Sequence, residues 1–64
     1  MSLTETQKLL VRYLKSLNLD SEKIIGTMLF LPKEEQLEKL GEFLVENPQA
    51  TEDQILEKVL ELSE

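Results

Sequence analysis

The sequence contains no cysteine, no histidine and no tryptophan among its 64 residues. Without cysteine the chain can form neither a disulfide nor a thiolate metal site. Without histidine it lacks the side chain used most often in general acid–base catalysis, and it cannot build the Glu-x-x-His di-metal sites of helical bundles. We therefore expect no enzymatic activity, no cofactor, no metal site and no small-molecule substrate.

Long apolar runs are also missing. The densest run is Ile24 to Leu31, in which six of eight residues are large and apolar, whereas a membrane-spanning helix needs about 20 apolar residues. The run predicts a nearly buried helix against which the rest of the chain packs. No charged and then apolar leader opens the sequence, so we expect a cytoplasmic protein without a membrane partner.

The charge is unevenly distributed along the chain. Acidic residues outnumber basic ones by 13 to 7, which gives a net charge of −6. Residues 33–64 hold ten acidic and three basic residues, whereas residues 1–32 hold three acidic and four basic ones. A strongly acidic half disfavours phosphate backbones and anionic membranes as partners. Protein is therefore the expected partner, ahead of nucleic acid.

The positive signal in the sequence is helical periodicity. Apolar residues recur at spacings of three and four, which predicts short helices over residues 3–17, 21–31, 33–46 and 52–62 in one domain, 1–64. The predicted core faces are Leu3, Leu10, Leu14 and Leu17; Ile24, Ile25, Met28 and Leu31; Leu37, Leu40 and Leu44; and Ile55, Val59 and Leu62. We expect an all-α protein.

Capping signals mark where these helices begin. Ser2 with Glu5, and Thr51 with Gln54, fit the capping box, in which each side chain satisfies a free backbone N–H of the first turn. The second helix begins after Asp20 or Ser21, since both side chains are suitable caps.

Other residues mark where the helices end. Asn18 suits the left-handed position that follows a helix. Asn47-Pro48 closes the third helix, and Pro32 both ends the second helix and suits the first position of the third. That corner favours a compact orthogonal bundle over an up-down one. Gly26 costs about 1 kcal/mol relative to alanine inside a helix. Either the helix simply tolerates this cost, or a neighbouring helix passes close to this position.

Several apolar residues lie off the predicted core faces. Phe30 and Val45 do so on the second and third helices, while Leu56 and Leu60 widen the apolar face of the fourth. Either the core wraps around them, or Phe30, Leu56 and Leu60 anchor a partner or a weak homodimer. The leading interpretation is a small acidic protein–protein interaction module whose biological process the sequence does not identify.

A basic ridge on the first helix supports an alternative. Lys8, Arg12 and Lys15 lie opposite its apolar stripe, where three cations could bind nucleic acid or form an ordinary solvated face. Residues 33–62 resemble a helix-turn-helix only in outline, because Glu52 and Asp53 place negative charge where phosphates would lie. A nucleic-acid-associated regulator is therefore the second interpretation, and an acidic mimic of nucleic acid is a third.

Overall fold

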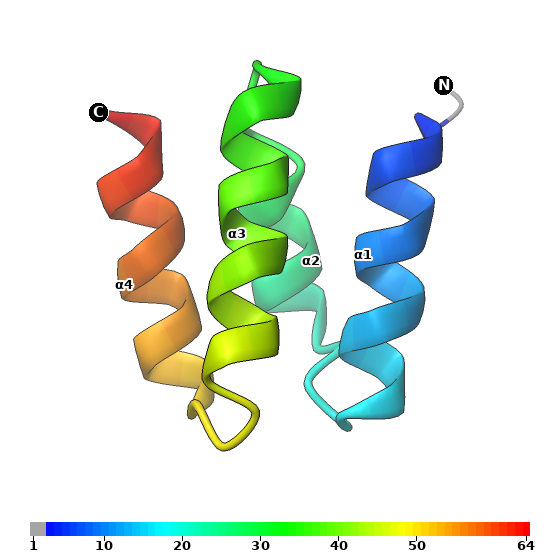
Figure 1. Cartoon of the computed structure of the whole chain (residues 1–64), viewed down its shortest axis with the longest axis vertical. Helices are drawn as coiled ribbons and strands as arrows, with labels where there is room; N and C mark the ends of the chain where they lie inside the picture. The colour runs from blue at the N-terminus through cyan, green and yellow to red at the C-terminus, as the bar shows by residue number, and fades with distance from the viewer. Residues whose placement is uncertain (1–2) are drawn as a thin grey trace.

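The computed structural model describes residues 3–64, and its regular structure is a bundle of helices (Figure 1). They are α1 (Glu5–Ser16), α2 (Glu22–Met28), α3 (Glu34–Glu46) and α4 (Glu52–Ser63). The predicted all-α bundle of four short helices is confirmed. The third and fourth helices agree with their predicted bounds to within one residue, whereas the second is shorter at its C-terminal end.

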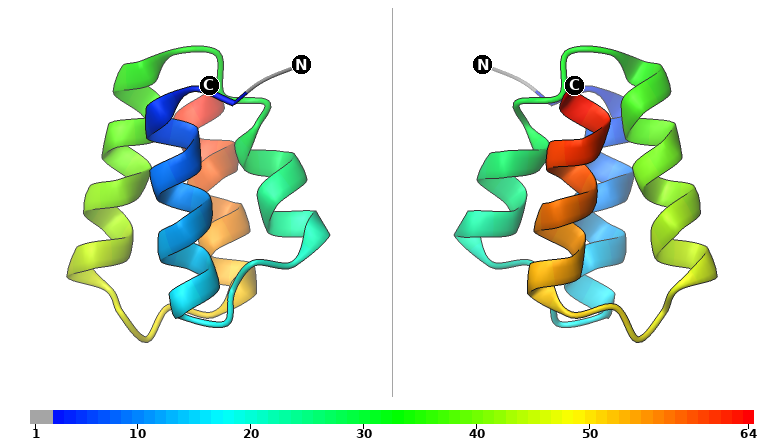
Figure 2. Two further views of the ribbon diagram at one scale, coloured as in Figure 1. Left: turned by 90° about the vertical axis from the view of Figure 1, so that its right-hand side faces the viewer. Right: turned by 90° about the vertical axis from the view of Figure 1, so that its left-hand side faces the viewer.

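Successive helices run in alternating directions along the long axis of the molecule (Figure 1). As a result, α1 and α3 run the same way. Seen from the side, α1 lies opposite α4, with α2 and α3 flanking them (Figure 2). The main packing pairs are α1–α3, α3–α4 and α2–α4.

The chain order is therefore up-and-down, and the orthogonal arrangement expected from the corner at Pro32 is not seen. The physical reason lies in the link between α2 and α3. Because α2 ends at Met28, residues 29–33 are free to reverse the chain direction. Pro32 lies within this link and precedes the N-cap residue Lys33, so it does not open the helix itself.

Capping boxes open α1 and α4. The Thr4 hydroxyl accepts from the Gln7 backbone N–H (3.1 Å), and the Thr4 N–H donates to Gln7 Oε1 (2.9 Å). Thr51 and Gln54 make the same pair of hydrogen bonds at 3.3 and 2.8 Å, as predicted. The box of α1 thus lies two residues after the predicted one; Ser2, the cap expected there, lies outside the described residues.

The other two helices begin differently. Ser21 caps α2 by accepting from the Ile24 N–H (3.3 Å), which decides between the two predicted caps. At α3 the cap is one-sided, because a lysine side chain has no acceptor atom. The Lys33 N–H donates to Gln36 Oε1 (3.0 Å), and Gln36 Nε2 donates to the Leu62 carbonyl of α4 (2.7 Å).

Asn18 ends α1 in the left-handed conformation, with φ at 61°. The Leu19 N–H donates to the Leu14 carbonyl (2.9 Å) and the Asn18 N–H to the Lys15 carbonyl (3.1 Å). These two bonds form a Schellman motif, which satisfies carbonyls that the helix itself cannot. The predicted left-handed cap is confirmed.

The core draws on every helix. Its buried residues are Leu10, Leu14, Ile24, Met28, Leu31, Leu37, Leu40, Leu44, Ala50, Ile55 and Val59. Three predicted core residues, Leu17, Ile25 and Leu62, are only partly buried. Leu3 precedes α1 and is exposed, since no helix holds it on the apolar face. Ala50, in the link between α3 and α4, was not predicted, because one small apolar residue in a loop carries no periodic signal.

The prediction of a nearly buried second helix was wrong. Ile24, Met28 and Leu31 reach the core, but α2 is short, and Leu29 and Phe30 lie exposed in the link that follows it. No atom lies within 4 Å of the place where a Cβ of Gly26 would be, so no close neighbour requires a glycine there. The helix simply tolerates it.

Candidate interaction surfaces

An apolar groove of about 350 Å³, here called the α1–α3 groove, lies between α1 and α3. Its lining residues are Thr6, Leu9, Leu10, Tyr13, Leu37, Glu38, Gly41 and Val45. The Thr6 hydroxyl donates to a Glu34 carboxylate oxygen, which joins the first turns of the two helices. This bond brings the N-terminal ends of α1 and α3 together.

Gly41 helps to form this groove because it has no side chain. A Cβ added there would lie 3.4 Å from the Leu10 side chain and would take up part of the space between the helices. Leu9 and Val45 line the groove with 60% and 66% of their surface exposed. Large apolar side chains this exposed beside an apolar hollow are typical of a surface that another molecule covers.

The two sides of the α1–α3 groove differ in charge. On α3, Glu38 lines the groove and Glu42 lies one turn further along the same face. Successive residues of a helix lie 100° apart, so Arg12 lies about 60° around α1 from Leu9, on the side away from Tyr13. All three charged residues are exposed. The groove therefore has a cation outside its α1 wall and two carboxylates along its α3 wall.

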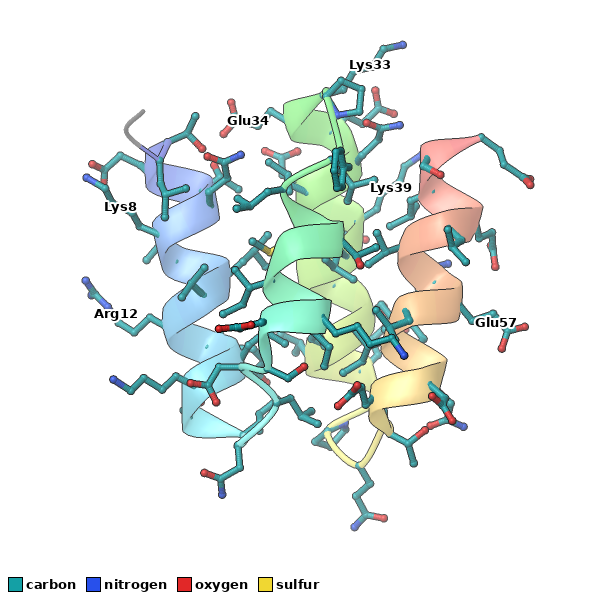
Figure 3. All side chains as sticks on the ribbon, turned by 180° about the vertical axis from the view of Figure 1, so that it is seen from behind. Lys8, Arg12, Lys33, Glu34, Lys39 and Glu57 are labelled. Atoms are coloured by element: carbon teal, nitrogen blue, oxygen red, sulfur yellow. The ribbon has the colours of Figure 1, made fainter. Side chains whose placement is uncertain are left out.

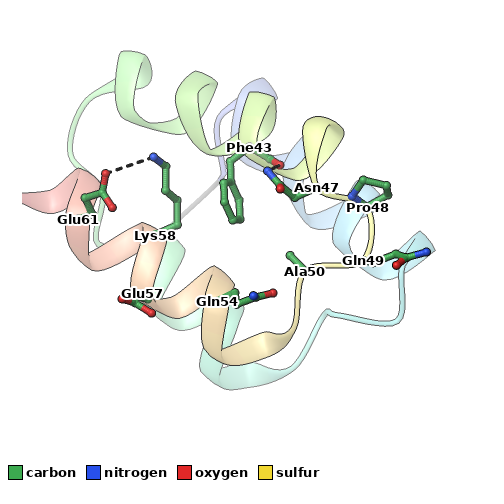
Figure 4. A pocket seen from close by; sticks show the side chains of 9 residues that line it. All are labelled: Phe43, Asn47, Pro48, Gln49, Ala50, Gln54, Glu57, Lys58 and Glu61. Atoms are coloured by element: carbon green, nitrogen blue, oxygen red, sulfur yellow. Dashed lines mark hydrogen bonds and ion pairs between the residues drawn. The ribbon is translucent and has the colours of Figure 1, made fainter.

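A second groove, of about 520 Å³, lies between the C-terminal half of α3 and α4 (Figure 4). The Lys58 ammonium group lies 5.7 Å from the centre of the Phe43 ring and 3.4 Å from Glu61 Oε1. Glu57 and Gln54 add further polar groups to the lining. The lining of this groove is more polar than that of the α1–α3 groove, so it offers less apolar contact to a partner.

The apolar residues predicted as anchors occupy different environments. Phe30 is 83% exposed in the link after α2, and Leu60 is 62% exposed on α4. Leu56 is partly buried and packs against the core. None of the three lines the α1–α3 groove.

Leu9 was missed by the sequence reasoning, although a signal for it exists. Leu9, Leu10 and Val11 are three consecutive apolar residues. Because neighbours in a helix lie about 100° apart, three in succession cannot all face one core. Leu10 is buried and Val11 partly buried, so Leu9 is the one left outside.

The basic ridge lies where the periodicity placed it. Lys8, Arg12 and Lys15 are exposed, and Figure 3 shows the first two extending from α1 away from the other helices. Lys8 pairs with Glu5 at 3.9 Å within the same helix.

In the part of the chain that the structure describes, no group of three acidic side chains comes together as a metal site. Within residues 3–64 no helix combines the length and apolar character needed to cross a membrane. Comparison with known protein families, characterised proteins and solved structures finds no match to this chain.

Proposed function

We propose that this protein is a protein–protein interaction module that binds its partner through the α1–α3 groove. The observation that carries the proposal is the exposure of Leu9 and Val45 beside an apolar groove. A partner that covers these side chains gains apolar contact, which supplies most of the affinity at protein interfaces. The acidic character of α3 and α4 then contributes to partner choice and association rate.

The charges favour a protein over a nucleic acid as the occupant. Nucleic-acid surfaces are recognised through phosphate contacts, which need several cations on one face. The α1–α3 groove has carboxylates on its α3 wall, and the cations Lys8 and Lys15 lie further from it than Arg12 does. Binding to nucleic acid through the ridge of α1 is therefore the second candidate, and it would leave the groove uncovered.

We include no catalytic step in this function. The acidic side chains lie on outer faces, and the chain has no histidine or cysteine to act as a base or nucleophile. We also propose a cytoplasmic location, since a cysteine-free chain has no disulfide that would call for an oxidising compartment.

Site-specific photocrosslinking in the cell tests the proposal. A benzophenone amino acid at Leu9 or Val45 should form protein adducts, because these side chains would lie within the interface. The same probe at Glu57, an exposed residue of α4, is the matched background. Phe30 and Leu60 are probed in parallel, because they are the anchors predicted from the sequence.

Adducts from Phe30 or Leu60 alone would move the interface away from the groove. Adducts from Leu9 and Val45 no more abundant than those from Glu57 would refute the proposed function.

A further inference from the structure

We propose that the occupant of the α1–α3 groove is a second copy of this chain, related to the first by a two-fold axis parallel to α1 and α3. This inference rests on the proposed function and names its partner. It follows from the opposite charges of the two walls and from the heights at which those charges lie.

The direction of the two helices decides which symmetry suits the charges. Because α1 and α3 run the same way (Figure 1), a two-fold axis parallel to them places α1 of one copy opposite α3 of the other. A perpendicular axis in the interface would instead oppose α1 to α1 and α3 to α3, which sets acidic walls against each other. Only the parallel axis pairs the Arg12 wall with the Glu38 and Glu42 wall, and it does so twice.

The heights of these charged residues also agree. The Leu10 side chain lies 3.4 Å from the Cβ position of Gly41, so these two residues lie at about the same height along the helix axes. Each later residue rises about 1.5 Å along its helix. Arg12 therefore lies about 3 Å above this level, Glu42 about 1.5 Å above it and Glu38 about 4.5 Å below it. A parallel two-fold axis leaves heights unchanged, so Arg12 of one copy lies nearest in height to Glu42 of the other.

The apolar residues agree with the same arrangement. Leu9 lies one residue before Leu10 and so within about 1.5 Å of the height of Gly41, which lines the groove on α3. Leu9 of each copy therefore faces the apolar part of the groove in the other copy. The charges on the rim select the orientation of the pair, and the apolar contact between the copies holds it together.

Sedimentation equilibrium on the purified chain, from micromolar to millimolar concentration, tests the pairing. The wild-type chain should show a reversible monomer–dimer equilibrium, and Leu9→Lys should abolish the dimer. Leu60→Lys is the matched control, since Leu60 is as exposed as Leu9 but lies on α4. It should leave the dimer unchanged, and circular dichroism should show equal helix content in both variants.

Charge reversal then tests the symmetry. Arg12→Glu and Glu42→Lys should each weaken the dimer by roughly tenfold, because the symmetry repeats every unfavourable contact twice. An equal mixture of these two variants should associate more strongly than either variant alone, since both Arg12–Glu42 contacts are then attractive. Lys15→Glu, the same change further around α1, should alter the dissociation constant by less than about twofold.

Three results would overturn the pairing: a wild-type monomer up to millimolar concentration, a Leu9→Lys variant that still dimerises, or a mixture no stronger than its components. A monomeric chain whose Leu9 probe still crosslinks to a different protein in the cell would refute the self-pairing and leave the proposed function standing. A monomer that forms no crosslink from the groove would refute both.

Discussion

Gln36 Nε2 donates a hydrogen bond of 2.7 Å to the Leu62 carbonyl and joins the first turn of α3 to the last turn of α4. The other end of the same amide accepts from the Lys33 N–H. Carbonyls in the last turn of a helix have no partner within the helix. One glutamine side chain therefore satisfies an unpaired group at each of two helix ends.

The first prediction separates these two roles of Gln36. Gln36→Glu keeps the acceptor for the Lys33 N–H, but it replaces the donor to Leu62 with a charged oxygen. We expect the free energy of unfolding to fall by about 1 kcal/mol, measured by urea denaturation. Gln54→Glu adds the same charge at a capping box without a bond to another helix, and it should change stability by less than about 0.5 kcal/mol. Equal losses in both variants would contradict this assignment.

Replacing Gly26 with alanine is predicted to stabilise the protein. The φ of Gly26 is not positive and no atom lies within 4 Å of the Cβ position, so Gly26→Ala should stabilise the protein by about 1 kcal/mol. Gly41→Ala should yield a smaller gain, because its Cβ would lie 3.4 Å from Leu10. Thermal unfolding of both variants checks the order. A Gly26→Ala variant that melts below the wild type would show an unrecognised constraint on α2.

Asn18 should respond differently to two small substitutions. A left-handed backbone is strained for alanine and unstrained for glycine. Asn18→Ala should therefore lower the free energy of unfolding by about 1 kcal/mol, while Asn18→Gly should leave it equal or higher. Chemical denaturation of the two variants side by side is the measurement. If alanine is tolerated as well as glycine, the Schellman motif contributes little to the end of α1.

Leu56 and Leu60 are predicted to differ, although the sequence places both in one wide apolar arc. Leu56 packs against the core and Leu60 is exposed. Leu56→Ala should destabilise the protein by about 1–2 kcal/mol, whereas Leu60→Ala should cost less than about 0.5 kcal/mol. Urea denaturation gives both values. If the double variant keeps its stability and helix content but loses self-association, the interface lies on α4 instead of in the α1–α3 groove.

Much of this protein was determined by the sequence alone, because the signals concerned are local. The four helices follow from the spacing of apolar residues. The caps at Thr51 and Asn18 follow from hydrogen bonds between residues at most five positions apart. The buried residues Leu37, Leu40 and Leu44 were predicted for the same reason, since a helix of known phase has only one apolar face.

Tertiary structure alone decided how the helices are arranged. The pairing of α1 with α3, and the bond from Gln36 to Leu62, join residues more than 20 positions apart, which no periodicity within a helix can specify. The exposure of Phe30 depended on where α2 ends, and that of Leu9 on which neighbour packs beside α1. The groove exists only because two helices that are not consecutive in the chain lie side by side, and so the assembly of its residues into one surface could be recognised only in the folded protein.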